Sequence, residues 1–238
     1  MLTFVKPNQC FEEDQVVIRH ELGHALAAFV LGFGVGRIAF ARLDDMILAG
    51  GVRSRTPDNR PPERELDQSI VMRLLVGEIA GRKYLDMPLD EVCSDFYISH
   101  RYSYSYANSV TRGSHDDISK AISISSKYGQ EWYTFLSRCH DEARTIVEKG
   151  WGAIESASVI VQKRGLPKTS GATLLIPSLE VIRSFEHSGS APGRGIAVEV
   201  AHHELLGSRW LRLIRNFRQR VAKNLLVETD EFKSASFP

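Results

Sequence analysis

Residues 20–24 of this chain have the sequence HELGH, which matches the pattern HExxH. Residues four apart on an α-helix lie on the same face one turn apart, so His20 and His24 can bind one metal ion together. Apolar side chains surround the motif and acidic residues precede it, as is typical of a helix that packs into a core. The motif therefore predicts a buried helix over residues 11–31, which Gly32 ends.

Glu21 gives this predicted site its chemistry. It lies three residues before His24, so its carboxylate falls next to the open coordination position of a metal that the two histidines bind. A bound Zn²⁺ lowers the pKa of its water and polarises a carbonyl group, while a nearby carboxylate takes the proton of that water. We therefore expect a zinc-dependent hydrolase of peptide bonds, with Zn²⁺ as the cofactor and Glu21 as the catalytic general base.

Two histidines do not complete a catalytic zinc site, which usually has three protein ligands and one open position. The candidates for the third ligand are other histidines and carboxylates of the chain: Glu78, His100, His115, Asp116, Asp117 and His140. The spacing of these residues does not select one of them.

The remaining hydrophobic pattern predicts a mainly α fold with a small β element (α+β). The HExxH motif adds the expectation that its helix is zincin-like and belongs to a helical peptidase domain. Strands or extended segments are expected at 37–43, 47–55 and 174–177. Further helices are expected at 64–85, about 115–128, about 131–164 and 178–187. Residues 86–112 show no regular pattern.

Three blocks of the chain occur in an order that resembles the peptidase domain of the FtsH-type AAA metalloproteases. They are HELGHALAAFVLG at 20–32, LLVGEIAGRKYL at 74–85 and GSHDDISKAISISSKYG at 113–129. That family has HEAGHAL, a pair of strands, a helix with a sequence like GGRAAEEL, and then GASND before an amphipathic helix. The resemblance covers residues 12–187 and implies Asp117 as the third zinc ligand, with its neighbour Asp116 as an alternative.

The chain departs from the family pattern in three places. It contains no ATPase module and no GxxxxGK[ST] phosphate-binding loop, so we expect ATP-independent cleavage of flexible or unfolded polypeptides. The paired glutamates of the family fall on Gly81 and Arg82, so a carboxylate usually near the zinc is missing unless Glu78 replaces it. The stretch 86–112 is also longer than the corresponding connection of the family.

The HELGH motif also resembles the ImmA/IrrE-type regulatory metallopeptidases, in which a glutamate on a later helix completes the site before a segment that ends in LLMP. Here Glu78 precedes YLDMP at 84–88, so this alternative implies Glu78 as the third ligand. It leaves the block at 113–129 unexplained. A further alternative is a non-catalytic binding module that keeps the zinc fold, although the presence of Glu21 favours an enzyme.

The second predicted strand contains a candidate substrate-binding segment, Gly50-Gly51-Val52. In zinc peptidases an extended substrate commonly adds to the edge of a sheet, where main-chain hydrogen bonds hold any sequence near the metal. Two successive glycines leave the backbone open to such pairing. We therefore expect Gly50, Gly51 and Val52 to contact a polypeptide substrate.

The composition of the chain changes after residue 187. We expect a metallopeptidase domain over 1–187, a flexible linker over 188–195, and a basic amphipathic helix with a tail over 196–238. The stretch 209–223 has six basic residues and no acidic one, beside an apolar stripe. We expect this stripe to pack on the peptidase domain or on a second copy of the chain in a homo-oligomer, rather than on a membrane surface. The net charge of +1 argues against a nucleic-acid partner.

The cysteines and the apolar runs indicate a cellular compartment. Cys10, Cys93 and Cys139 lie far apart without a CxxC pair, which favours a reducing environment. The first nine residues lack the apolar core of a secretory signal. The most apolar run, 25–36, has 12 residues, whereas about 20 are needed to span a bilayer. We therefore expect a soluble, cytoplasmic protein.

Overall fold

The structure is a computed structural model that describes residues 7–42, 48–56, 61–89 and 110–190. Within these stretches the side chains are described from residue 13 onward and, in the last stretch, from residue 117 onward. The chain divides into two compact units, residues 1–200 and 201–238, and every described residue belongs to the first unit. The predicted basic stretch at 209–223 and most of the predicted linker lie outside the described residues, so those expectations stay predictions.

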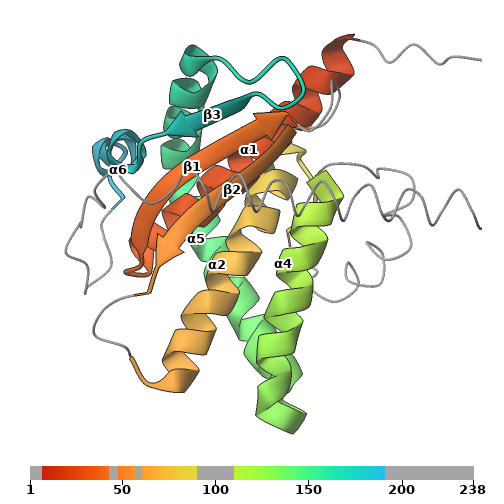
Figure 1. The fold of residues 1–238 in the computed structure, drawn as a ribbon. Coiled ribbons are helices and arrows are strands. Elements are labelled where there is room, and N and C mark those ends of the chain that lie inside the picture. The colour runs from red at the N-terminus through yellow and green to blue at the C-terminus, as the bar shows by residue number, and fades with distance from the viewer. Residues whose placement is uncertain (1–6, 43–47, 57–60, 90–109, 191–238) are drawn as a thin grey trace, which may run out of the picture. The chain divides into compact units, whose positions relative to one another are not determined.

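The described residues form a mainly helical fold with one small sheet, as Figure 1 shows. The helices are α1 (Pro7–Val30), α2 (Glu63–Tyr84), α4 (Val110–Ser125), the 3₁₀-helix η1 (Ser126–Glu131), α5 (Trp132–Arg164) and α6 (Ser178–His187). The strands are β1 (Gly34–Arg42), β2 (Leu48–Arg55) and β3 (Thr173–Ile176). This arrangement confirms the predicted mainly α fold with a small β element. None of the described helices combines the length and the apolar character needed to cross a membrane.

One helix differs clearly from its predicted bounds. Helix α4 begins at Val110 rather than near residue 115, so the GSHDD block at 113–117 lies inside the helix and not before it. Its polar residues interrupt the apolar spacing on which the prediction of the helix depended, and glycine and serine are weak helix formers. The two turns of α4 before Asp117 were therefore not recognised in the sequence.

The sheet has the strand order β2-β1-β3, and both pairs of neighbours are antiparallel. Phe40 on the central strand lies opposite Gly50 on β2 and Leu174 on β3. The extended segment predicted at 174–177 thus corresponds to β3, although its pairing with β1 was not predicted. Because β1 is central, the outer edge of β2 has no neighbouring strand among the described residues.

Helix α1 carries the HELGH motif and lies at the centre of the domain, because it packs against both hairpin strands and against α2 and α5 (Figure 1). Its apolar side chains, such as Ile18 and Leu22, are fully buried. Helices α1 and α2 approach closely at Gly23, where a Cβ atom would lie only 2.9 Å from the Cβ atom of Ala80. The chain leaves the helix through Gly32, as predicted, with a positive φ of 86° that favours glycine.

Two bidentate ion pairs fix α1 relative to its neighbours. Arg42 at the end of β1 donates two hydrogen bonds to Asp14, at 2.9 and 2.7 Å, and one from Nε to the carbonyl oxygen of Pro167 at 2.9 Å. Arg19 donates to both carboxylate oxygens of Glu155 on α5, at 2.8 and 2.9 Å. Bidentate pairs add geometric specificity to charge attraction, so these contacts set the orientation of the motif helix.

Cys139 on α5 provides a chemical test of this core. Its side chain is 1% exposed, and burial, with a smaller contribution from the Glu142 carboxylate, raises the pKa of its thiol to about 12. Because the thiolate is the reactive form, we expect Cys139 to react with DTNB at pH 8 more than about 100-fold slower than free cysteine. The measurement uses a Cys10→Ser/Cys93→Ser variant, in which Cys139 is the one remaining thiol. The same variant in guanidinium chloride should react at the free rate, and an equally fast native reaction would contradict this packing.

Candidate metal centre

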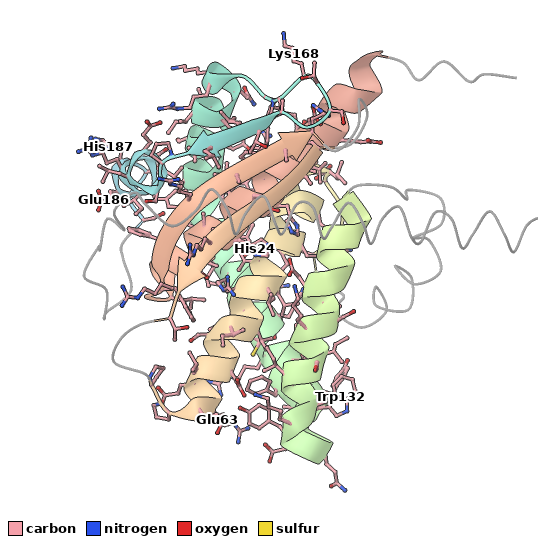
Figure 2. The ribbon with its side chains drawn as sticks, viewed as in Figure 1. His24, Glu63, Trp132, Lys168, Glu186 and His187 are labelled. Atoms are coloured by element: carbon pink, nitrogen blue, oxygen red, sulfur yellow. The ribbon has the colours of Figure 1, made fainter. Side chains whose placement is uncertain are left out.

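Helix α1 brings the two histidines of the motif together in the interior of the domain. His20 and His24 are 5% and 8% exposed, and their Nε2 atoms lie 3.0 Å apart. The two rings meet edge to face, with 4.6 Å between their centroids. Figure 2 labels His24, which lies in the interior beside α2. One turn of helix therefore places two imidazole nitrogens side by side.

Helix α4 adds a carboxylate to the two imidazoles. Asp117 Oδ2 lies 2.9 Å from His24 Nε2 and 3.6 Å from His20 Nε2. Asp117 is 93 residues away from His24 in the chain, so the fold and not the local sequence makes this contact. Within the part of the chain that the structure describes, His20, His24 and Asp117 are the one group of histidine, cysteine and acidic side chains arranged to hold a metal ion.

A hydrogen bond to the backbone of α2 fixes the proton on His24. Its Nδ1 lies 2.7 Å from the carbonyl oxygen of Arg73, and because a carbonyl group only accepts, Nδ1 carries the hydrogen. In the neutral imidazole, Nε2 then has a free electron pair, which is directed at His20 and Asp117. Metal-binding histidines commonly have this arrangement, in which the second ring nitrogen donates to a backbone carbonyl or to a carboxylate.

The donor atoms of this cluster fit a small metal ion. Nε2 of His24 and Oδ2 of Asp117 are both electron-pair donors, and at 2.9 Å they repel each other unless a proton or a cation lies between them. The three separations of 2.9, 3.0 and 3.6 Å bracket the edge of a tetrahedron around a metal with bonds of about 2.0–2.1 Å, which is about 3.3 Å. Three ligands at the corners of such a tetrahedron leave the fourth position open.

The histidines set the charge of Asp117. Burial alone would raise the pKa of this carboxyl group, but hydrogen bonds with His20 and His24, and the charges of these rings when protonated, hold its pKa well below the usual range. Asp117 is therefore a carboxylate at neutral and mildly acidic pH, which is the form that binds a metal.

Glu21 lies between α1 and β2, where it is 8% exposed. Its carboxyl group packs on the backbone of Gly50, since a Cβ atom at that position would lie 2.7 Å from Glu21 Cδ and 2.8 Å from Oε1. The strand can approach the helix this closely only because residue 50 has no side chain. Burial raises the pKa of Glu21 to about 7, with His20 lowering it and Asp117 raising it. A carboxyl group with such a pKa exchanges its proton near neutral pH.

The predicted substrate-binding residues lie in the middle of β2. Gly51 and Val52 pair with Ala39 and Ile38 on the inner side of the strand. The outer side of β2 has no neighbouring strand among the described elements, and a strand edge of this kind can pair with an extended chain. Gly50 is the residue of this strand that packs closely against the Glu21 side chain.

The other predicted ligands are not brought into the cluster. Glu78 on α2 and His140 on α5 are described, and neither belongs to the group that could hold a metal ion. The side chains of His115 and Asp116 and the whole of His100 lie outside what the structure describes. Of the described candidates, Asp117 is thus the one that meets both histidines.

Two residues of the site, Arg73 and Gly77, were not predicted from the sequence. A Cβ atom at Gly77 would lie 2.9 Å from Cδ2 of His24 and closer still to Cε1 and Nε2, so the absence of a side chain makes room for the ring. An isolated glycine inside a helical pattern usually has a packing reason, and this signal was present at residue 77. Arg73 contributes its backbone carbonyl, which no side-chain pattern reveals.

No family model matches this chain, and no curated protein matches it significantly. The resemblance to the FtsH-type peptidases therefore stays an expectation that depends on three short sequence blocks. Function has to be argued from the site itself, because a fold alone does not determine chemistry.

The contact between Gly77 and His24 generates a prediction with an internal control. Gly77→Ala should lower the free energy of unfolding by about 1–3 kcal/mol, because the new methyl group overlaps a ring that the Arg73 carbonyl holds in place. Gly152→Ala, on α5 with nothing within 4 Å of the new Cβ atom, should instead raise it by about 0.5–1 kcal/mol. Urea unfolding of both variants measures the difference, and equal effects would contradict the close packing at Gly77.

Proposed function

We propose that this chain is a zinc-dependent metallo-endopeptidase that cleaves flexible or unfolded polypeptides without ATP. The observation that carries the proposal is the meeting of His20, His24 and Asp117 next to Glu21, from two helices that are far apart in the sequence. A helix that packs its other faces into the core has no structural need for two histidines and a glutamate at these positions.

Zinc is the metal that suits this set of ligands. His20, His24 and Asp117 would hold it, since two imidazoles and one carboxylate with an open fourth position are typical of catalytic zinc. When bound, Zn²⁺ lowers the pKa of a water molecule toward neutrality and polarises a carbonyl group. The hydrogen bond from His24 Nδ1 to Arg73 supports the assignment, because it places a hydrogen on Nδ1 and orients the ring so that Nε2 faces His20 and Asp117.

Glu21 acts as the general base of the proposed reaction. Its carboxylate takes a proton from the attacking water and later gives it to the amine that leaves the cleaved peptide bond. The contact with Gly50 excludes solvent from one side of this carboxyl group and holds it between the helix and the strand. The proposed base is thus held in place next to the proposed metal ligands.

The outer edge of β2 is the proposed binding site for the substrate backbone. A polypeptide paired with the outer edge of β2 at Gly50, Gly51 and Val52 would lie about 4.8 Å from the strand that packs on Glu21. Main-chain pairing requires an extended segment but no particular sequence, so flexible or unfolded chains are the expected substrates.

The metal assignment is tested by measuring zinc directly. Purified protein should contain about one zinc per chain, and Asp117→Ala should weaken zinc binding more than about 100-fold, because removal of a ligand costs more than removal of an outer hydrogen bond. Glu78→Ala serves as the control and should bind zinc as the wild type does. If Asp117→Ala kept zinc while Glu78→Ala lost it, the site would instead use Glu78, as in the ImmA/IrrE-type alternative.

The role of Glu21 is tested with Glu21→Gln. The amide has the same shape but cannot accept the proton of water, so hydrolysis of an unfolded protein such as casein should fall about 10²–10⁴-fold or more while zinc binding stays. Glu186→Gln on the exposed face of α6 is the matched control and should keep full activity. If wild type and Glu21→Gln both bound unfolded protein without cleaving it, the chain would be a binding module and not an enzyme.

A further inference from the structure

Arg73 on α2 lies next to the candidate metal centre but takes no part in the proposed chemistry. Its backbone carbonyl accepts the hydrogen bond from His24, which places the residue directly beside a proposed ligand. Its side chain extends away from α2 to strand β2, where Nη1 donates to Ser54 Oγ at 2.7 Å. The guanidinium group thus bridges the helix that supports the metal site and the strand proposed to bind the substrate.

The positive charge of Arg73 is only partly compensated. Among the described residues it forms no ion pair, its Nη1 donates to a neutral hydroxyl group, and its Nε is buried without a hydrogen-bond acceptor. Burial lowers the pKa of this side chain while Asp117 raises it, and an arginine stays protonated throughout the physiological range. The charge of Asp117 acts on this half-buried cation without forming an ion pair with it, so among the described residues the guanidinium group has no direct carboxylate partner.

The hairpin beside Arg73 is positively charged as well. The described parts of β1 and β2 contain four arginines and no acidic residue: Arg37, Arg42, Arg53 and Arg55. Arg42 is neutralised by Asp14, whereas Arg53 is exposed on β2.

The register along β2 relates Arg73 to the position of cleavage. Gly50 packs on Glu21 and Ser54 binds Arg73, and these two strand residues lie on the same face because side chains alternate along a strand. Four residues of strand span about 13 Å. A substrate paired with β2 and cleaved beside Glu21 thus brings a side chain near Arg73 within about four residues of the cleaved bond.

We propose that Arg73 forms a subsite for an acidic side chain of the polypeptide substrate. The inference rests on the proposed function and adds a preference to it: an aspartate or glutamate carboxylate accepts a hydrogen bond from Nη2, because Nη1 is bonded to Ser54 and Nε is buried. Ser54 keeps that group facing the strand. Arg73 is therefore a specificity-determining residue for the same metallopeptidase site.

The test is a set of unstructured peptides with one cleavable sequence, in which a single glutamate or glutamine is placed at each of the four positions on either side of the cleaved bond. With wild-type protein, kcat/KM should be about 10-fold or more higher for glutamate than for glutamine at one of these positions. Arg73→Gln should remove the preference, which is measured as the ratio of kcat/KM for the glutamate peptide to that for its glutamine partner. Arg73→Lys, which keeps the charge without the planar fork, should keep part of the preference. Arg53→Gln, on the opposite face of β2, is the matched control and should keep the full preference.

A binding measurement with the Glu21→Gln protein separates this inference from the proposed function. Fluorescence anisotropy should show tighter binding of the preferred glutamate peptide than of its glutamine partner, and Arg73→Gln in this background should remove the difference. Cleavage without a glutamate preference would overturn the subsite and keep the peptidase. If the glutamate peptide bound selectively but neither the wild type nor any variant cleaved it, the peptidase function would be overturned and the subsite kept. If neither selective binding nor cleavage were observed, both proposals would be overturned.

Discussion

The hydrogen bond from His24 to the carbonyl oxygen of Arg73 orients the side chain at which the three helices of the site meet. His24 belongs to α1, this bond attaches it to α2, and its other ring nitrogen contacts Asp117 on α4. The bond forms because α1 and α2 cross closely, with Gly23 on one helix and Gly77 on the other. The orientation of the imidazole therefore depends on backbone packing as much as on the motif itself.

Helix α1 contains an unusual number of buried polar side chains for a central helix. At its start and on one side, Asp14 and Arg19 are satisfied by arginine and glutamate partners from other elements. In its middle, His20, Glu21 and His24 meet mainly one another, Asp117 and backbone groups. The paired charges fix the helix, while its middle holds two of the three side chains of the candidate metal centre. One helix thus holds its structural ion pairs at its start and on one side, and the residues of the proposed site in its middle.

The parts of this structure that depend on local sequence could be predicted, and those that depend on distant contacts could be predicted only in part. HELGH predicts a helix with two histidines on one face because their spacing is a property of the helix alone. The hairpin and the long helices can be predicted from the spacing of the apolar residues along the sequence. The pairing of β3 with β1 and the backbone bond at Arg73 have no local signature. Spacing alone left six candidates for the third ligand, and the family resemblance, not a physical rule, selected Asp117.

The residues of the candidate metal centre are far apart in the sequence, so the ribosome adds them to the chain at different times. His20 and His24 can be brought together as soon as the first helix forms, but Asp117 is added to the chain 93 residues after His24. Helix α5, which packs on both α1 and α2, is made later still. An emerging chain therefore has an incomplete site until most of the domain has been synthesised. In a protein with the proposed activity, this order of assembly protects the unfolded remainder of the same chain from cleavage by its own N-terminal part.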